Sequence, residues 1–194
     1  ARNLRFSLPN GNISLDADSA AAASMTNRNF KLNDLRGRNV RIRNVDKRTN
    51  VDISSLQARS AELKGRRLDD VTADKFSLTD LPNSTELSAS NLRAARLNAD
   101  GTVIEGLSSP EVSLTDTPAE TRIYADTLRV AKIDAGSAVL GSLNIAGVRL
   151  TIREGRIEGT SKDIDAGNVT LAKTDSLPSG GELRDVKISK PVFI

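Results

Sequence analysis

The sequence predicts an all-β fold, namely a single elongated β-solenoid (a parallel β-helix) built from about five 36-residue repeats. Three observations predict it: a repeat that spans the chain, a finer beat of five residues inside each repeat, and a composition of 38% hydrophobic but only 3% aromatic residues. Each repeat of such an array buries its apolar face only on its neighbours. We therefore expect one domain over residues 1–194.

The repeat consists of columns of apolar residues. The copies are 4–39, 40–75, 76–111, 112–147 and 148–183, followed by a partial copy at 184–194. The clearest columns hold Val40, Phe76, Val112 and Val148; Ile42, Leu78, Leu114 and Leu150; Leu56, Leu92, Leu128 and Ile164; Leu32, Leu68, Ile104 and Leu140; and Leu35, Val71, Leu107 and Leu143. We expect the members of a column to face the same interior.

Inside each copy, apolar residues occupy mostly positions one and three of every five. Residues 51–80 show this beat as VDISS, LQARS, AELKG, RRLDD, VTADK and FSLTD. A helix needs apolar spacing near 3.6, and a long regular strand needs strict alternation. Two inward residues flanking one outward residue, followed by two polar residues, indicate a short strand and then a corner. The spacing leaves open whether each copy is one wide coil or two narrow ones.

Seven groups of five make 35 residues, so each 36-residue copy contains one extra residue. It falls at 46–50, 82–86, 118–122 and 154–158. Two of these segments carry proline, which lacks the N–H that a strand ladder needs. We expect a loop that protrudes from the same edge of every copy.

Residues 18–25 allow two interpretations. Asp18 or Ser19 is a suitable N-cap for a short helix over the alanines that follow. The repeat alignment instead makes the segment a strand with small inward residues, and the register of Leu15, Ala17 and Ala20 favours the strand.

The composition excludes several kinds of chemistry. The chain has no cysteine and no histidine, which removes disulfides, thiolate zinc sites and Ser–His or Cys–His nucleophile systems. The repeated Ser-Leu-Thr-Asp segments at 77–80 and 113–116 predict side chains that stack at a corner and bond turn backbone. We predict no enzyme activity and no catalytic, cofactor-binding or metal-binding residues. No apolar run approaches the roughly 20 residues of a membrane span.

The small net charge of +3 is unevenly distributed. Residues 1–70 hold 14 Lys and Arg against 8 Asp and Glu, whereas residues 71–194 hold 14 against 17. The basic residues concentrate at Arg36, Arg38, Arg41, Arg43, Lys47 and Arg48. This group predicts contact with a polyanion or with the negative end of another subunit, or it is a solvated face.

Two five-residue groups, Ala61-Glu-Leu-Lys-Gly65 and Val51-Asp-Ile-Ser-Ser55, resemble the pattern of the pentapeptide-repeat proteins. That resemblance implies a quadrilateral right-handed β-helix. Leu56, Leu92 and Phe76 depart from the pattern, because they place a large residue first where the family prefers a small one. The chain is similar, more distantly, to bactofilins and to the periplasmic β-domains of the AsmA and TamB lipid-transport families.

The first functional prediction is a structural subunit that stacks head to tail into a filament or stalk. Unpaired solenoid ends offer a template for edge pairing. The basic first part of one subunit would also attract the acidic later part of the next, which favours a head-to-tail contact. The last residues, Pro191, Val192, Phe193 and Ile194, are apolar and would need cover from the next subunit.

Two alternatives remain open at this point. One is an adhesin or binding module whose loops contact a carbohydrate or a protein. The other is a lipid conduit of the AsmA or TamB kind, which needs an open apolar groove; the low aromatic content and the polar corners count against it. A chain that begins at Ala1 suggests a processed protein, and we expect a secreted, cell-surface or periplasmic location.

Overall fold

The computed structural model describes residues 5–7, 12–26, 30–63, 66–99, 102–154, 156–173 and 179–193. These residues form fifteen strands of a single sheet and no helix. The strands are β1 (Arg5–Ser7), β2 (Ile13–Thr26), β3 (Phe30–Val45), β4 (Arg48–Ile53), β5 (Ser55–Leu63), β6 (Arg66–Ala73), β7 (Lys75–Leu81), β8 (Ser84–Ala99), β9 (Thr102–Asp116), β10 (Thr121–Asp134), β11 (Ala138–Arg153), β12 (Arg156–Thr160), β13 (Asp163–Leu171), β14 (Gly181–Ser189) and β15 (Val192–Phe193). The predicted all-β class is confirmed.

The strands pair antiparallel, not as the parallel coils that the five-residue beat predicted. The β3–β4 connection shows why: Asp46 and Lys47 both have positive φ, 47° and 65°. Two such residues make a tight hairpin that sends the chain back beside itself. A parallel neighbour would need a crossover of a dozen or more residues, which these connections do not supply.

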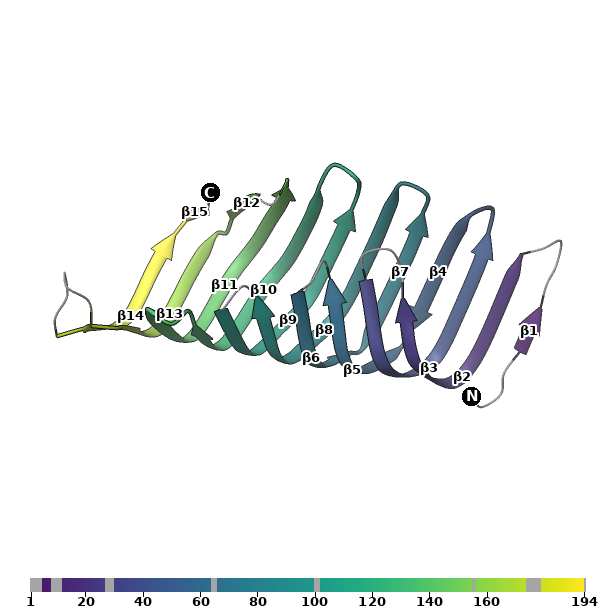
Figure 1. The fold of residues 1–194 in the computed structure, drawn as a ribbon, viewed down its shortest axis with the longest axis horizontal. Helices are drawn as coiled ribbons and strands as arrows, with labels where there is room; N and C mark the ends of the chain where they lie inside the picture. Colours follow the sequence, from purple (N-terminus) through teal and green to yellow (C-terminus); the bar gives the residue numbers. More distant parts are fainter. Residues whose placement is uncertain are drawn as a thin grey trace.

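Each 36-residue copy has the length of two long antiparallel strands, counting β4 and β5 as one bent strand, rather than of one or two coils. The copy 40–75, for example, runs from the second half of β3 through β4 and β5 to the end of β6. The connections at 46–47, 82–83 and 117–120 lie along one edge of the sheet, the upper edge in Figure 1. The predicted repeating loop at one edge is therefore a hairpin turn. The strand interpretation of residues 18–25 is also confirmed, since they belong to β2.

The long strands bend, and they bend together. Asp34, Asp70, Gly106 and Ser142, spaced by 36 residues, have φ of 50°, 51°, 63° and 55°. The register between neighbours stays unbroken across these positions, as in Ala94↔Leu107 followed by Arg96↔Glu105. Because all strands bend at the same level, the whole sheet curls.

The bends explain why apolar pairs recur every five residues. Five is an odd number, so strict alternation would turn every second apolar pair toward solvent. A bend between pairs, as at Asp34, Asp70, Gly106 and Ser142, absorbs an extra residue and returns the next pair to the inner face. The expected short strands and corners are thus present, but as segments of long bent strands.

The curled sheet has two walls (Figure 1). The back wall comprises β1, β4, β7, β12 and β15 together with the halves of the long strands that pair with them. The front wall comprises β5, β6, β13 and β14 with the other halves. β1 and β15 lie toward opposite ends of the array.

Six strands close a ring of antiparallel pairings in the order β3, β4, β7, β8, β6 and β5, and the other strands extend outward from it. The ring closes because β4 and β5 are two parts of one bent strand separated by Ser54, and β6 and β7 are separated in the same way by Asp74. β3 and β8 are long enough to pair with both parts. We call these six strands the six-strand ring.

Candidate functional site: an apolar trough between the walls

The inner face of the curled sheet is lined by apolar ladders that cross the strands. One ladder on the back wall passes through directly paired residues, namely Leu15, Ile42, Val51, Leu78, Leu87, Leu114, Ile123 and Leu150. On the front wall, Leu128, Ile145, Ile164 and Ile188 are paired in the same way. The predicted columns are confirmed as residues that share one face.

Two clusters of buried residues divide this inner face. The first combines both walls of the six-strand ring: it contains Val51, Ile53, Phe76 and Leu78 of the back wall and, from the front wall, Leu56, Ala58, Ala61, Val71 and Ala73. The second centres on Val130, Leu143 and Ala166, all on the front wall from β10 to β13. The walls are therefore packed together at the ring and are not joined by one cluster beyond it.

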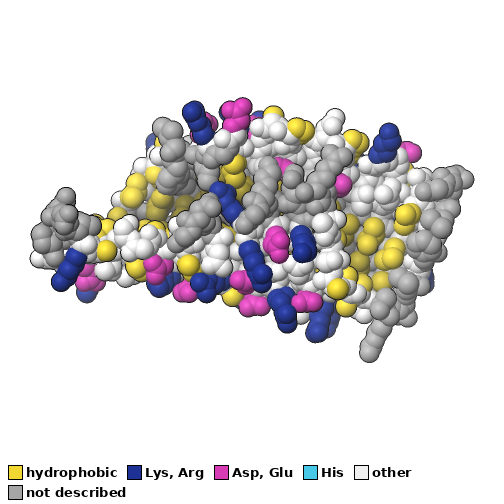
Figure 2. Space-filling view, viewed as in Figure 1, with side chains coloured by type: hydrophobic (Ala, Val, Ile, Leu, Met, Phe, Trp, Pro, Cys, Tyr) yellow, Lys and Arg dark blue, Asp and Glu magenta, His cyan; other side chains and the backbone are white. Residues whose placement is uncertain are grey.

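Beyond the ring the inner face is apolar, and many of its side chains are only half buried around the buried Val130, Leu143 and Ala166. Ile104, Leu128, Ile133, Leu140, Ile145, Ile164, Val169 and Val186 pack against the second cluster while remaining partly accessible. On β14, the outermost strand of the front wall, Leu183 and Ile188 are 54% and 47% exposed. Figure 2 shows apolar side chains exposed toward the β11–β14 end, on the left, and a second group near β2–β4 on the right. We call the apolar inner face between the two walls the trough.

Threonine and aspartate side chains pair across the hairpins at one edge of the trough. The hydroxyl of Thr121 donates to Oδ1 of Asp116 at 2.5 Å, and both side chains are buried. One repeat earlier, Thr85 donates to Asp80 at 2.9 Å. The two Ser-Leu-Thr-Asp segments were predicted to bond turn backbone, whereas the structure shows their aspartates accepting a hydrogen bond from a threonine across the hairpin.

Glu120 anchors the turn between β9 and β10. Its carboxylate contacts Arg122, and its Oε2 accepts from Nε of Arg153 at 2.6 Å. Its backbone carbonyl accepts from both the N–H and the hydroxyl of Thr117. The hydrogen bond from Arg153 and the positive charge of both arginines hold the pKa of Glu120 below its usual value.

The stability of the protein should consequently depend on pH through Glu120. Because its pKa is lowered in the folded state, its ion pairs stabilise the fold above the ordinary carboxyl pKa, and this contribution is lost as the pH falls through the lowered value. The difference in melting temperature between wild type and Glu120→Gln should be largest near neutral pH and should shrink below about pH 4. Glu111→Gln is the control, since Glu111 has no ion pair with a described residue. A difference that stays constant with pH would contradict the assignment.

The six predicted basic residues lie along β3 and the hairpin that follows it. The first four, Arg36, Arg38, Arg41 and Arg43, occupy the outer face of β3, opposite to its inward apolar residues. Two of them pair with one carboxylate: Arg41 Nε lies 3.2 Å and Arg43 Nη2 lies 2.8 Å from Asp16. These contacts, with the hydrogen bond from Arg43 as the largest, lower the pKa of Asp16. Lys47 lies in the turn, and Arg48 donates to Asn50.

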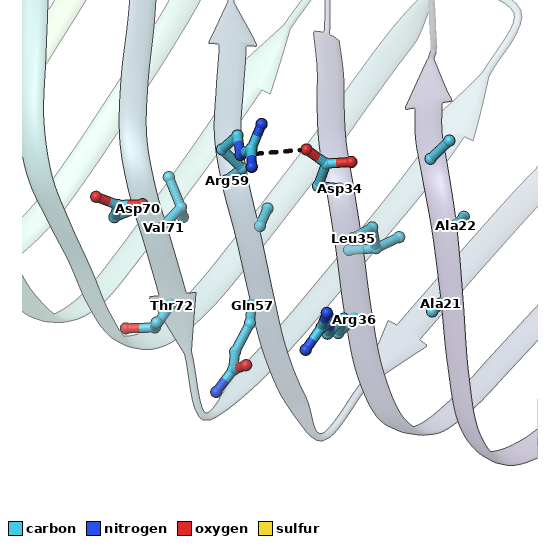
Figure 3. Close-up of a pocket in the computed structure, with 12 residues that line it drawn as sticks. Ala21, Ala22, Asp34, Leu35, Arg36, Gln57, Arg59, Asp70, Val71 and Thr72 are labelled. Atoms are coloured by element: carbon cyan, nitrogen blue, oxygen red, sulfur yellow. Dashed lines mark ion pairs between the residues drawn. The ribbon is translucent and has the colours of Figure 1, made fainter.

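Arg36 also lines a shallow hollow of about 760 Å³ outside the bend of β2, β3, β5 and β6 (Figure 3). Two carboxylates, Asp34 and Asp70, share it with Arg36 and Arg59. Arg59 Nε lies 3.3 Å from Asp34, but both side chains are more than half exposed, so water and salt screen the pair. Charges of both signs in one exposed hollow favour neither an anion nor a cation.

The four apolar residues at the carboxyl end are incorporated into the sheet as far as they are described. Val192 and Phe193 form β15, which pairs with Thr160 and Gly159 of β12. Val192 is 67% exposed, Pro191 accepts a hydrogen bond from the N–H of Ser161, and Ile194 lies outside the described residues.

The sequence did not single out the half-buried inner side chains of β9–β14 as a site, although the columns already contained them.

Three further observations bear on the site. No group of three or more acidic side chains among the described residues is placed to hold a metal ion. The described part of the chain also contains no helix of the length and hydrophobicity needed to cross a membrane. No family model matches the chain, and neither a curated protein nor a solved structure shows significant similarity to it.

Proposed function

We propose that the trough binds the acyl chains of lipids or other long amphiphiles, as a conduit or carrier does. The observation that supports this proposal is the row of half-buried aliphatic side chains on the inner face of β9–β14. Soluble proteins rarely leave a large continuous apolar surface open to water unless it meets a ligand or a partner. The polar corners that counted against a lipid groove in the sequence lie at the bends and on the outer face, so they do not interrupt this surface.

The chemistry of the lining suits hydrocarbon better than an extended peptide. Ser109 is a polar exception on the inner face, and its hydroxyl already donates to the carbonyl of Glu111 at 2.8 Å. The backbone groups of the floor are used in the sheet ladders. An extended peptide would leave its own N–H and C=O groups without partners there, at a cost of about 1–3 kcal/mol each, whereas hydrocarbon has none.

The length of the lining also suits an acyl chain. The front-wall strands from β9 to β14 follow the order β9, β10, β11, β13 and β14, which at about 4.8 Å between neighbours makes about 19 Å. One lipid leaflet contributes about half of a hydrocarbon core of about 30 Å. Each CH₂ group transferred from water to the lining contributes about 0.8 kcal/mol.

A fluorescence titration with dansyl-labelled undecanoic acid tests this function. We compare wild type with Ile145→Asp, which places a carboxylate among the inner residues, and with the matched control Asn144→Asp on the outer face. Ile145→Asp should weaken binding by at least about tenfold because hydrocarbon would contact an ionised group, and Asn144→Asp should leave it unchanged. Circular dichroism verifies that both variants keep their strands, and Ile145→Thr replaces a variant that does not fold. Absence of binding to wild type, or equal losses in both variants, would refute the proposal.

A second candidate function, head-to-tail self-association, is supported by the edges of the sheet. β1 pairs with only the first part of β2, so the outer edge of residues 19–26 pairs with no strand among the described residues. That edge contains four consecutive alanines and lacks the lysines or prolines that usually block edge pairing. Ten front-wall strands alternate in direction from β2 to β14, so copies related by translation would continue the antiparallel order.

Sedimentation over a concentration series tests this association. Ala21→Lys places a charge on the exposed edge strand, and Ala95→Lys places the same charge on the exposed face of the central strand β8. Self-association that is lost in Ala21→Lys and retained in Ala95→Lys would support edge pairing. A wild type that sediments as a monomer at every concentration would exclude it for this chain.

A further inference from the structure

The outer face of the back wall carries a row of polar side chains in direct register across five neighbouring strands. From β4 through β7, β8 and β9 to β10, the row consists of Asp52, Ser77, Ser88, Ser113 and Tyr124. Each of them is adjacent in sequence to a residue of the inner apolar ladder, so the row points away from the trough. At about 4.8 Å between neighbouring strands the row is about 19 Å long. We call it the outer row.

A hollow of about 590 Å³ runs along the outer row and is lined by all five of its residues. Four more outward side chains line it, namely Ser54, Lys75, Ser90 and Glu111. Within the row, the hydroxyl of Ser77 donates to Oδ1 of Asp52 at 2.8 Å. The hollow therefore combines serine hydroxyls, two carboxylates and a lysine ammonium group with the ring of Tyr124 at one end.

The ring of Tyr124 is held from the side away from the hollow. Tyr124 is 37% exposed, and the guanidinium carbon of Arg149 lies 5.7 Å from the centroid of its ring. Arg149 belongs to β11, which pairs with β10 on the side opposite to β9. A cation over one face of an aromatic ring stabilises the position of that ring. The other face is thus directed toward β9 and the hollow.

The chemistry of the hollow suits an uncharged ligand that is rich in hydroxyl groups. The carboxylates of Asp52 and Glu111 would repel a phosphate or sulfate, and the ammonium group of Lys75 would repel a cation. Serine hydroxyls both donate and accept, carboxylates accept, and an aromatic ring offers a flat apolar face. A sugar ring has the complementary parts, because hydroxyl groups surround its rim and C–H groups cover its faces.

We propose that this hollow binds a neutral oligosaccharide, with one sugar ring stacked on Tyr124 and the hydroxyl groups of the following rings bonded to the serines and carboxylates of the outer row. Because the row is longer than a single sugar ring, an oligosaccharide makes contacts that a monosaccharide cannot. The hollow lies on the outer face, so this inference does not depend on acyl binding in the trough.

Tyrosine fluorescence tests the proposal directly, since Tyr124 is the only tyrosine of the chain and tryptophan is absent. The probes are cellohexaose, chitohexaose, maltohexaose and mannohexaose, each with its monosaccharide. At least one hexasaccharide should change the emission of Tyr124 with a Kd below about 1 mM. Its monosaccharide should bind at least about tenfold more weakly, because it occupies only one part of the row.

Calorimetry with the hexasaccharide that binds then compares four variants. Tyr124→Ser should weaken binding by at least about fivefold, whereas Tyr124→Phe, which keeps the ring, should stay within about threefold of wild type. Asp52→Asn should weaken binding by at least about fivefold because a charged acceptor becomes a neutral one. Asp126→Asn is the matched control: it removes an exposed carboxylate from β10 outside the outer row and should leave the Kd unchanged.

Circular dichroism verifies the strands of each variant, and Asp52→Asn carries the comparison if Tyr124→Ser does not fold. A wild type that binds none of the hexasaccharides would overturn the proposal. Equal losses in Asp126→Asn and in the variants of the outer row would also overturn it, since the ligand would then lie elsewhere. Tighter binding of a sulfated heparin hexasaccharide than of any neutral probe would do the same, because it would show an anion site.

Discussion

Replacement of Leu32 by alanine should lower the free energy of unfolding by about 2–5 kcal/mol, the range for removing a large side chain from a packed core. Leu32 is 1% exposed and belongs to the cluster that joins both walls of the ring. Its loss leaves a cavity that neighbouring strands cannot fill, because both partners of its pair, Met25 and Ala61, are held in register.

Leu140→Ala is the matched control for this prediction. It removes the same atoms from the same column, but from the half-buried floor beyond the ring, and should cost about 1 kcal/mol. Urea unfolding gives both values, provided that the slope with urea is unchanged between variants. Equal losses would mean that the walls are equally packed along the whole trough and would contradict the two-cluster description.

Replacement of Thr121 by valine should cost about 1.5–3 kcal/mol, the range for a hydrogen bond to a charged group. Valine keeps the shape of threonine and removes only the hydroxyl that donates to Asp116. Thr121 is 0% exposed and Asp116 is 4% exposed, so water cannot readily replace this bond.

Thr85→Val makes the same change one repeat earlier, where Thr85 and Asp80 are both half buried and water can compensate. Its cost should be about 0.5–1.5 kcal/mol. Chemical denaturation of the two variants is the measurement. A smaller effect at Thr121 than at Thr85 would show that burial does not strengthen this hydrogen bond.

The proposed function depends on features that the sequence showed only in part. The columns named the inner residues correctly, including Ile104, Leu128 and Leu140. They could not show whether those residues are covered, since Leu32 and Leu140 share a column and differ in burial. Coverage depends on the distance between walls formed by residues far apart in the chain.

The basic residues illustrate the same limit. Their number and spacing were visible in the sequence, but the partner of Arg41 and Arg43 was not. Asp16 lies 25 and 27 residues away along the chain and meets them only because β2 and β3 pair with Asp16 opposite Arg41. The register between paired strands, rather than the composition, therefore decides which arginines have an acidic side chain opposite them and which remain available to bind another molecule.

By itself, the sequence determined the all-β class, the two-residue pairs that face inward, the bends between them and the edge at which the turns recur. These features depend on local alternation and on the residues of each turn. Only the tertiary structure decided that neighbouring strands run antiparallel, because an inward–outward pattern is the same in both directions and the hairpin at Asp46 and Lys47 carries no glycine to reveal itself. It also decided which of the inner residues are buried, since that depends on how closely the two walls pack.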